Sequence, residues 1–261
     1  METEARRRIE MSRRAQLICV WCGPVMLASI GVGLVVLAGF IPGPHPKANA
    51  HQIASQYVHN LSGIRAGLCI FMAGIALIGP WGAALLSQTN RARLGTPVLT
   101  HTQVVCVAVT MMIGVASCIC WGTAALRAGD SSPGTIRTFN DLGWIFFIFD
   151  WSPLAVWYMA VGLSIFFDPS DAPVFPRWAA WLSAWTAILS IPGGFTIFFT
   201  TGPLAFNGLL ALWVPLSVFG VWIVTMTVLV IKAINREAGS ARLGLDPVQG
   251  DLGQLRDQLV A

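Results

Sequence analysis

Charged side chains are scarce in this sequence. Only 11% of the 261 residues are Asp, Glu, Lys or Arg, whereas soluble domains carry about 25%. Hydrophobic residues make up 55% of the chain. Too few polar side chains remain to cover a water-facing surface, which excludes an ordinary soluble globular protein. We therefore expect the lipid bilayer to surround most of the chain.

The distribution of the basic residues and of the cysteines excludes a nucleic-acid partner and a disulfide framework. The net charge is +4, but the basic residues lie at the ends of apolar runs and form no single patch, which excludes a nucleic-acid partner. All six cysteines fall inside apolar runs, which is typical of small buried side chains and not of a disulfide framework.

The sequence also lacks the usual signatures of catalysis and cofactor binding. It has no P-loop, no glycine-rich dinucleotide loop, no His-Glu-x-x-His and no nucleophile elbow. His51 and His59 are eight residues apart, about 12 Å along a helix, so they cannot share one metal ion. We expect no catalytic residues, no metal site and no cofactor.

Six apolar runs are present, and each is long enough to cross about 30 Å of hydrocarbon as a helix. The first run follows a basic segment but is longer than the 7–15 residues typical of a signal peptide. The sequence thus predicts an all-α bundle of six transmembrane helices over residues 17–235, with a basic tail at 1–16 and a flexible tail at 236–261. The predicted helices cover about 17–41, 64–87, 101–126, 142–167, 179–200 and 208–232.

The basic residues predict the orientation of this bundle. With a cytoplasmic N-terminus, 12 of the 16 Lys and Arg residues fall on the cytoplasmic side. Such a bias is the positive-inside pattern of membrane proteins, and it places both termini in the cytoplasm. The four basic residues expected outside are Lys47, Arg65, Arg127 and Arg137.

A short helix is predicted between the first two transmembrane helices. Asn49 and Gln52 have the spacing of a capping pair. Ile53, Tyr57 and Leu61 then form one apolar stripe at helical spacing. We expect this helix to be extracytoplasmic, where it lies on the membrane surface or caps the bundle.

Prolines recur inside the predicted spans, in every one except the third. Each removes a backbone hydrogen bond and bends its helix, and several bent helices favour a bundle with an internal cavity. The alternative is that proline is simply common in membrane helices. The residues are Pro24, Pro80, Pro153, Pro192 and Pro215.

Asp150 lies near the middle of the fourth predicted helix. An ionisable group at that depth costs at least ~2.5 kcal/mol, so it is expected to face protein or a watery cavity. It is a candidate for proton relay, cation binding or ligand anchoring, or else a polar contact that holds helices together. Asp141 lies nine residues earlier, on the opposite face and about 13 Å away, so the two carboxylates cannot share a proton or a metal.

The other candidate binding residues are expected at the outer end of the bundle. Asp141, preceded by Asn140, has the alternative role of a helix N-terminal cap. Arg65 either extends to the lipid headgroups or pairs with one of the two carboxylates. Together with His59, Asn140 and Asn207, Arg65 would line an outward-facing vestibule. The predicted ligand is small and either hydrophobic or cationic.

Four segments resemble a known family: FIPGPHP, FNDLGW, PVFPRWAAWLS and GPLAFNG. They are similar to segments of uncharacterised multi-pass inner-membrane proteins of actinobacteria and some proteobacteria. The resemblance covers most of residues 20–235 and implies the cytoplasmic membrane of a bacterium. It implies no activity and no site residues.

Three classes of function fit the sequence. The favoured one is binding or transport of a small molecule, including proton-linked transport, in an outward-facing cavity around Asp150. The second is an accessory or structural subunit, with a homo-oligomer or a membrane complex as its partner, for which Asp150 would be fully satisfied within the bundle. The third and weakest is a membrane-embedded enzyme acting on a lipid-like substrate.

Overall fold

The computed structural model describes residues 2–91, 97–170 and 172–242. Within these residues every regular element is a helix. Six helical stretches are long and apolar enough to cross a membrane, which confirms the predicted all-α architecture and the number of such helices. They are Met11–Leu37, Leu61–Thr89, Pro97–Leu126, Pro133–Phe166, Trp178–Phe198 and Leu209–Gly239. Most of the predicted C-terminal tail lies outside the described residues.

Most of the six stretches are built from two helical segments. Only the third is a single regular helix, α5 (Pro97–Leu126). The first combines α1 (Glu2–Ile30) with the π-helix η1 (Gly31–Leu37). The other pairs are α3 (Leu61–Ile75) with α4 (Ile78–Thr89), α6 (Pro133–Ile148) with α7 (Trp151–Phe166), α8 (Trp178–Ser190) with the 3₁₀-helix η2 (Ile191–Phe198), and the π-helix η3 (Leu209–Trp213) with α9 (Val214–Arg242).

Four of the five predicted proline bends coincide with these junctions. Pro80 and Pro153 follow the breaks between α3 and α4 and between α6 and α7. Pro192 lies where α8 changes to a 3₁₀-helix, and Pro215 where a π-helix changes to α9. Pro24 is the exception, because α1 continues through it. A proline cannot donate the helical hydrogen bond, so the helix changes form next to it.

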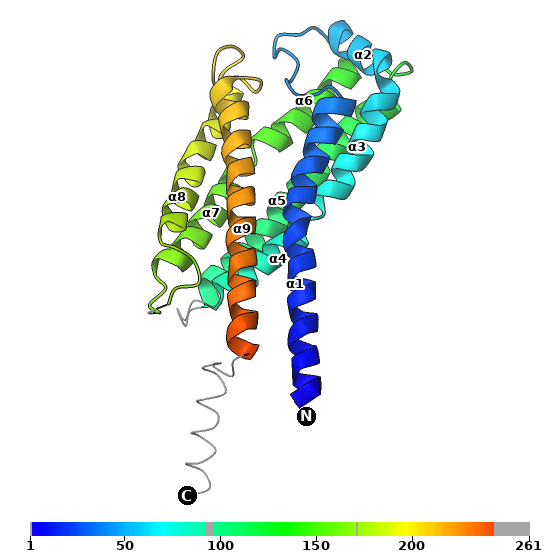
Figure 1. The fold of residues 1–261 in the computed structure, drawn as a ribbon. Helices are drawn as coiled ribbons and strands as arrows, with labels where there is room; N and C mark the ends of the chain where they lie inside the picture. Colours follow the sequence, from blue (N-terminus) through cyan, green and yellow to red (C-terminus); the bar gives the residue numbers. More distant parts are fainter. Residues whose placement is uncertain (1, 92–96, 171, 243–261) are drawn as a thin grey trace, which may run out of the picture.

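The two ends of the bundle differ. Figure 1 shows α1 beginning and α9 ending at the same end of the molecule. The short helix α2 (Ala50–His59) lies at the opposite end, where it packs mainly against α6. Asn49 and Gln52 form the predicted capping box, and Ile53 and Tyr57 form the buried face of α2. Which end faces the cytoplasm stays a prediction from the charge distribution.

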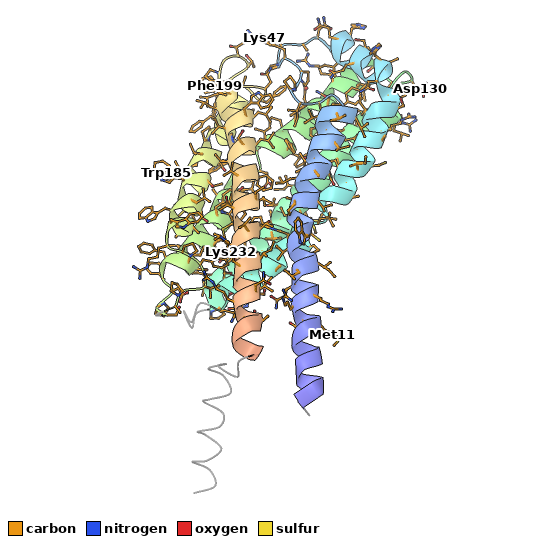
Figure 2. The ribbon with its side chains drawn as sticks, viewed as in Figure 1. Met11, Lys47, Asp130, Trp185, Phe199 and Lys232 are labelled. Atoms are coloured by element: carbon orange, nitrogen blue, oxygen red, sulfur yellow. The ribbon has the colours of Figure 1, made fainter. Side chains whose placement is uncertain are left out.

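The outer surface of the bundle is apolar. Ile18, Val36 and Ile119 are 56–72% exposed although they lie within membrane-spanning stretches. Trp185 on α8 projects away from the bundle (Figure 2) and is also exposed. Such a surface suits hydrocarbon and not water. The protein is an integral, multi-pass membrane protein.

A cluster of tryptophans joins the helices in the half of the bundle nearer the termini. The ring centroids of Trp81, Trp157 and Trp222 lie 5.4–5.9 Å apart with the rings edge to face. Trp81 Nε1 donates to Thr227 Oγ1 (2.9 Å), and Trp222 Nε1 donates to Ser183 Oγ (3.0 Å). Trp81 and Trp222 thus pack in an apolar core with their N–H groups satisfied, and the cluster with its hydrogen bonds links α4, α7, α8 and α9.

Two glycines allow the first span to cross α3 at close range. A Cβ added to Gly33 would lie 2.6 Å from the carbonyl oxygen of Gly67, and a Cβ on Gly67 would collide with the carbonyl of Gly33. Both obstacles are backbone atoms, which cannot rotate away. Small residues at such crossings are typical of membrane helix pairs.

We therefore expect Gly33→Ala to destabilise the protein by about 1–3 kcal/mol, the usual cost of overpacking. The measurement is the free energy of unfolding by denaturant titration in mild detergent. Gly31→Ala is the matched control, since it lies in the same π-helix and a Cβ there has nothing within 4 Å. Equal stability of the two variants would show that the helices do not cross as described.

Candidate functional site

Asp150 lies at a break between two helices and not within one continuous helix, which corrects the prediction. α6 ends at Ile148, and α7 begins at Trp151. Pro153 causes the break, because its ring clashes with the carbonyl four residues earlier, that of Phe149, and it has no N–H to donate to that carbonyl. Asp150 occupies the N-cap position of α7, but its side chain makes no capping hydrogen bond.

The Asp150 carboxylate is buried beside a cavity of about 100 Å³. Its Oδ1 has no hydrogen-bond partner among the described residues, and the same is true of Thr110 Oγ1 and Tyr158 Oη. All three residues line this one cavity. Buried polar atoms in proteins are normally satisfied, so three unsatisfied oxygens around one space indicate a site for water or a ligand.

The remaining walls of the cavity are mainly apolar and come from all six membrane-spanning stretches. They include five aromatic side chains that could contact a cation through their rings: Phe71, Phe146, Phe147, Trp151 and Phe219. The volume is smaller than the roughly 150 Å³ that accepts a benzene molecule in an engineered cavity. The space therefore suits a few water molecules or a ligand of fewer than about six non-hydrogen atoms.

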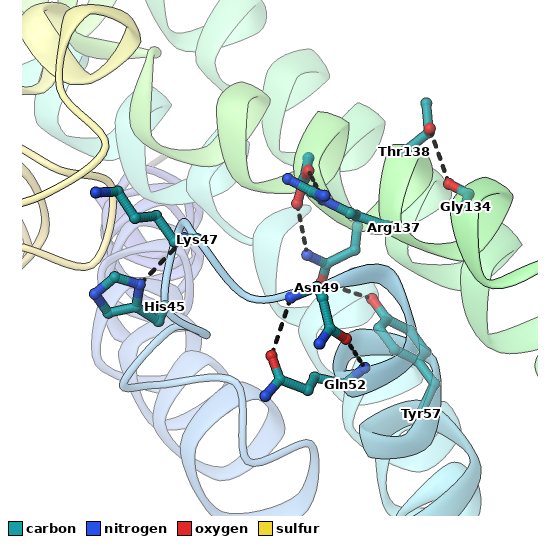
Figure 3. A network of polar contacts seen from close by, with 10 residues as sticks. His45, Lys47, Asn49, Gln52, Tyr57, Gly134, Arg137 and Thr138 are labelled. Atoms are coloured by element: carbon teal, nitrogen blue, oxygen red, sulfur yellow. Dashed lines mark hydrogen bonds and ion pairs between the residues drawn. The ribbon is translucent and has the colours of Figure 1, made fainter.

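Asn140 and Asp141 belong to a separate polar network that joins α2 to α6. Figure 3 shows two other members of it, Tyr57 on α2 and Arg137 on α6. The Tyr57 hydroxyl donates to Asn140 Oδ1 (3.2 Å), and Asn140 Nδ2 donates to Asp141 Oδ1 (3.1 Å). Arg137 Nε pairs with Asp141 Oδ2 at 3.4 Å. Tyr57 and Asn140 are buried, whereas the Arg137 and Asp141 side chains are about 40% exposed. The network fixes α2 to the end of the bundle opposite the chain termini.

The predicted role of Asp141 as a helix cap is wrong. The fourth span begins at Pro133, nine residues before the predicted start, and Ser132 is its N-cap. The Ser132 side chain accepts from Thr135 N, and the proline suits the first turn of the helix because its missing N–H is not needed there. Asp141 therefore lies more than two turns inside α6.

Arg65 does not pair with either carboxylate in the described part of the chain. Its Nη2 donates to the carbonyl of Ala125 at 3.1 Å. Ala125 lies in the last turn of α5, where carbonyl groups lack helical donors and a cation is favourable. Arg65 therefore ties α3 to the end of α5.

The six predicted binding residues do not form one site. Asp150 alone lines the cavity, and Asn140 and Asp141 lie in the network below α2. His59 is exposed at the end of α2, and Asn207 is half-buried in the segment between η2 and η3. The outward-facing vestibule is thus not assembled from these residues, because α2 packs over α6 and buries Asn140.

Sequence reasoning missed the two hydroxyl groups that share the cavity with Asp150. One feature of the sequence could have pointed to Tyr158: it is one of only two tyrosines in the chain, and it lies inside an apolar run. Thr110 carried none, because single threonines are tolerated at many positions of membrane helices. Their convergence depends on which faces of α5 and α7 meet.

Comparisons with known proteins give no match from which a function could be carried over to this chain. No family model, no curated protein and no solved structure matches this chain. The resemblance to multi-pass inner-membrane proteins therefore stays a prediction.

Tyr57→Phe should lower the free energy of unfolding by about 1–2 kcal/mol near neutral pH, because Asn140 Oδ1 loses its donor. Burial, with a further contribution from the charge of Asp141, raises the pKa of the Tyr57 hydroxyl above its ordinary value of about 10. Above pH 10 the unfolded chain loses this proton more readily than the folded protein, so the wild type loses stability as the pH rises.

The Phe variant lacks that titration, and the difference between the two proteins should narrow above pH 10. Denaturant titrations of both proteins between pH 7 and 11 measure this difference. Parallel stability curves over the whole range would contradict the buried hydrogen bond.

Proposed function

We propose that this protein binds a small cation in the cavity at Asp150 and acts in transport across the membrane. The observation that carries the proposal is that Asp150 Oδ1, Thr110 Oγ1 and Tyr158 Oη line one cavity and have no partner among the described residues. A proton held with water, a monovalent metal ion and a small protonated amine are the candidates that fit the volume.

The energetics favour a bound species over a purely structural role. An unsatisfied buried polar group costs about 1–3 kcal/mol, and hydrocarbon outside the bundle offers no compensation. If Asp150 merely held helices together, a neighbouring hydroxyl or amide would satisfy its Oδ1. A ligand or water that accepts and donates hydrogen bonds removes the cost at all three oxygens. The accessory-subunit interpretation is therefore the weaker one.

The chemistry of the lining favours a cation. Asp150 is the one charged residue among the residues that line the cavity. Pro153 leaves the Phe149 carbonyl without its helical donor, which adds a backbone dipole next to the carboxylate. Carboxylate, hydroxyl and carbonyl oxygens are the ligands that hard cations prefer.

The positions of the helix breaks support a transport role. The cavity is lined by Ser190, where α8 gives way to η2, and by Ala211 in the π-helix η3, as well as by the residues at the α6–α7 break. In secondary transporters, discontinuous helices near the middle of the membrane form the ion and substrate sites. The same arrangement here supports a site that the two halves of broken helices can open and close.

We infer the cytoplasmic membrane of a bacterium as the location, with both termini in the cytoplasm. The excess of basic residues on one side supports the orientation. Both ends of the described chain lie at one end of the bundle, in agreement with an even number of crossings (Figure 1).

Asp150→Asn should weaken cation binding at least tenfold, which corresponds to about 1.4 kcal/mol. The full chain in mild detergent is titrated with Na⁺, K⁺ and methylammonium, and binding is followed by native mass spectrometry and by the change in Tm. Uptake of each cation and of protons is followed in vesicles.

Asp141→Asn is the matched control, because it removes a carboxylate of the same span that lies outside the cavity. If both variants bind and transport like the wild type, the proposal fails. A homo-oligomer or membrane complex that dissociates in Asp150→Asn alone would favour the subunit interpretation.

The two tyrosines give a further prediction. Tyr158→Phe removes a hydroxyl that lacks a partner in the described residues, so the ligand-free protein should keep or gain stability while its affinity for the cation falls several-fold. Tyr57→Phe should do the opposite, with lower stability and unchanged affinity. Unfolding and binding measurements on both variants test this crossed pattern, and a loss of stability in Tyr158→Phe would show that its hydroxyl is satisfied.

A further inference from the structure

A second, larger hollow lies at the end of the bundle where α9 ends. Its volume is about 610 Å³. One wall is the last part of α9, the second is the segment 172–177 between α7 and α8 together with Trp178 at the start of α8, and the third is Arg91 just after α4. We call this hollow the basic groove because several of the side chains that line it are cationic.

Three of the side chains that line the basic groove are cationic: Arg91, Lys232 and Arg236. The one lining carboxylate, Glu237, is already paired with Arg91 at 2.9 Å. Lys232 and Arg236 are exposed and one helical turn apart on α9, and within the described residues neither forms an ion pair or a side-chain hydrogen bond. The groove therefore has two cationic groups available for an anion; Lys232 is labelled in Figure 2.

The other lining residues are mostly apolar. Leu229 and Ala233 lie on the same side of α9 as the cations, and Val174 and Trp178 face them from the α7–α8 segment. Trp178 is the first residue of the fifth membrane-spanning stretch, and Lys232 lies near the end of the sixth. By length alone, the groove thus lies at the boundary between hydrocarbon and water, where tryptophan is favoured.

The segment that forms the second wall is held by Asp168. Its Oδ1 accepts hydrogen bonds from the backbone N (3.1 Å) and the hydroxyl (2.7 Å) of Ser170, and its Oδ2 accepts one from Val174 N (3.3 Å). Asp168 is buried, and these three donors satisfy its carboxylate. It therefore does not compete with a ligand for the cations of the groove. The wall is therefore formed before any ligand binds.

We propose that the basic groove binds the headgroup of an anionic phospholipid. The phosphate contacts Lys232 and Arg236, and the first part of the acyl chains contacts Leu229 and Trp178. Basic pockets between helices at a membrane surface are suited to such headgroups. A free phosphate ion would use the cations but not the apolar wall, so the lipid is the source of the anion that the lining favours. This site is separate from the cavity at Asp150.

The test compares phosphatidylglycerol with phosphatidylcholine, added to the full chain in mild detergent and measured by native mass spectrometry and the rise in Tm. The wild type should bind phosphatidylglycerol at least tenfold more tightly than phosphatidylcholine. Lys232→Gln with Arg236→Gln should reduce phosphatidylglycerol binding at least tenfold, whereas Lys232→Arg with Arg236→Lys should retain it. Inorganic phosphate should neither raise the Tm nor displace the lipid.

The matched control is Lys47→Gln with Arg127→Gln, which removes the same charge from exposed residues outside the groove and should leave lipid binding unchanged. Asp150→Asn should also leave it unchanged, so failure of the cation site and failure of the lipid site are distinguishable. The proposal is overturned if the two double Gln variants lose binding equally, if phosphatidylcholine binds as well as phosphatidylglycerol, or if inorganic phosphate gives the same rise in Tm.

Discussion

A bilayer offers no hydrogen-bonding partners, and this constraint shapes the whole structure. Every backbone N–H and buried polar side chain within the hydrocarbon must find its partner in the protein. The chain meets the requirement with helices and with specific side-chain pairs such as Trp81 with Thr227 and Trp222 with Ser183. The places where it does not meet the requirement are therefore informative, and the cavity at Asp150 is the clearest of them.

Specific side-chain pairs join the helices at both ends of the bundle. At the end with the termini, Gln88 Nε2 donates to Gln16 Oε1 (2.9 Å), and Gln103 Nε2 donates to Ser164 Oγ (3.2 Å). At the other end, Tyr57 and Asn140 join α2 to α6. These pairs hold the helices together on either side of the cavity, and the three oxygens without a partner that share one space lie between them.

The two proposed sites have opposite charge and lie at different depths. The cavity offers a carboxylate and hydroxyl groups to a cation in the middle of the bundle, where desolvation strengthens electrostatic attraction. The basic groove offers Lys232 and Arg236 to an anion at the membrane boundary, where solvent weakens each contact and an apolar wall adds affinity. A lipid that fixes the end of α9 would act on the same helix that lines the cavity through Pro215 and Phe219.

Features that depend on local chemistry could be predicted from the amino-acid sequence. Long apolar runs determine the number of membrane helices, Asn49 and Gln52 start α2, and prolines mark the changes in helix form, because each of these effects acts within a few residues. Contacts between distant residues could not be predicted in this way: Asp150 shares a cavity with Tyr158 and Thr110, and Arg65 binds the Ala125 carbonyl in place of a carboxylate. Those contacts depend on helix rotation and on packing between segments far apart in the chain, of which the close crossing at Gly33 and Gly67 is one example.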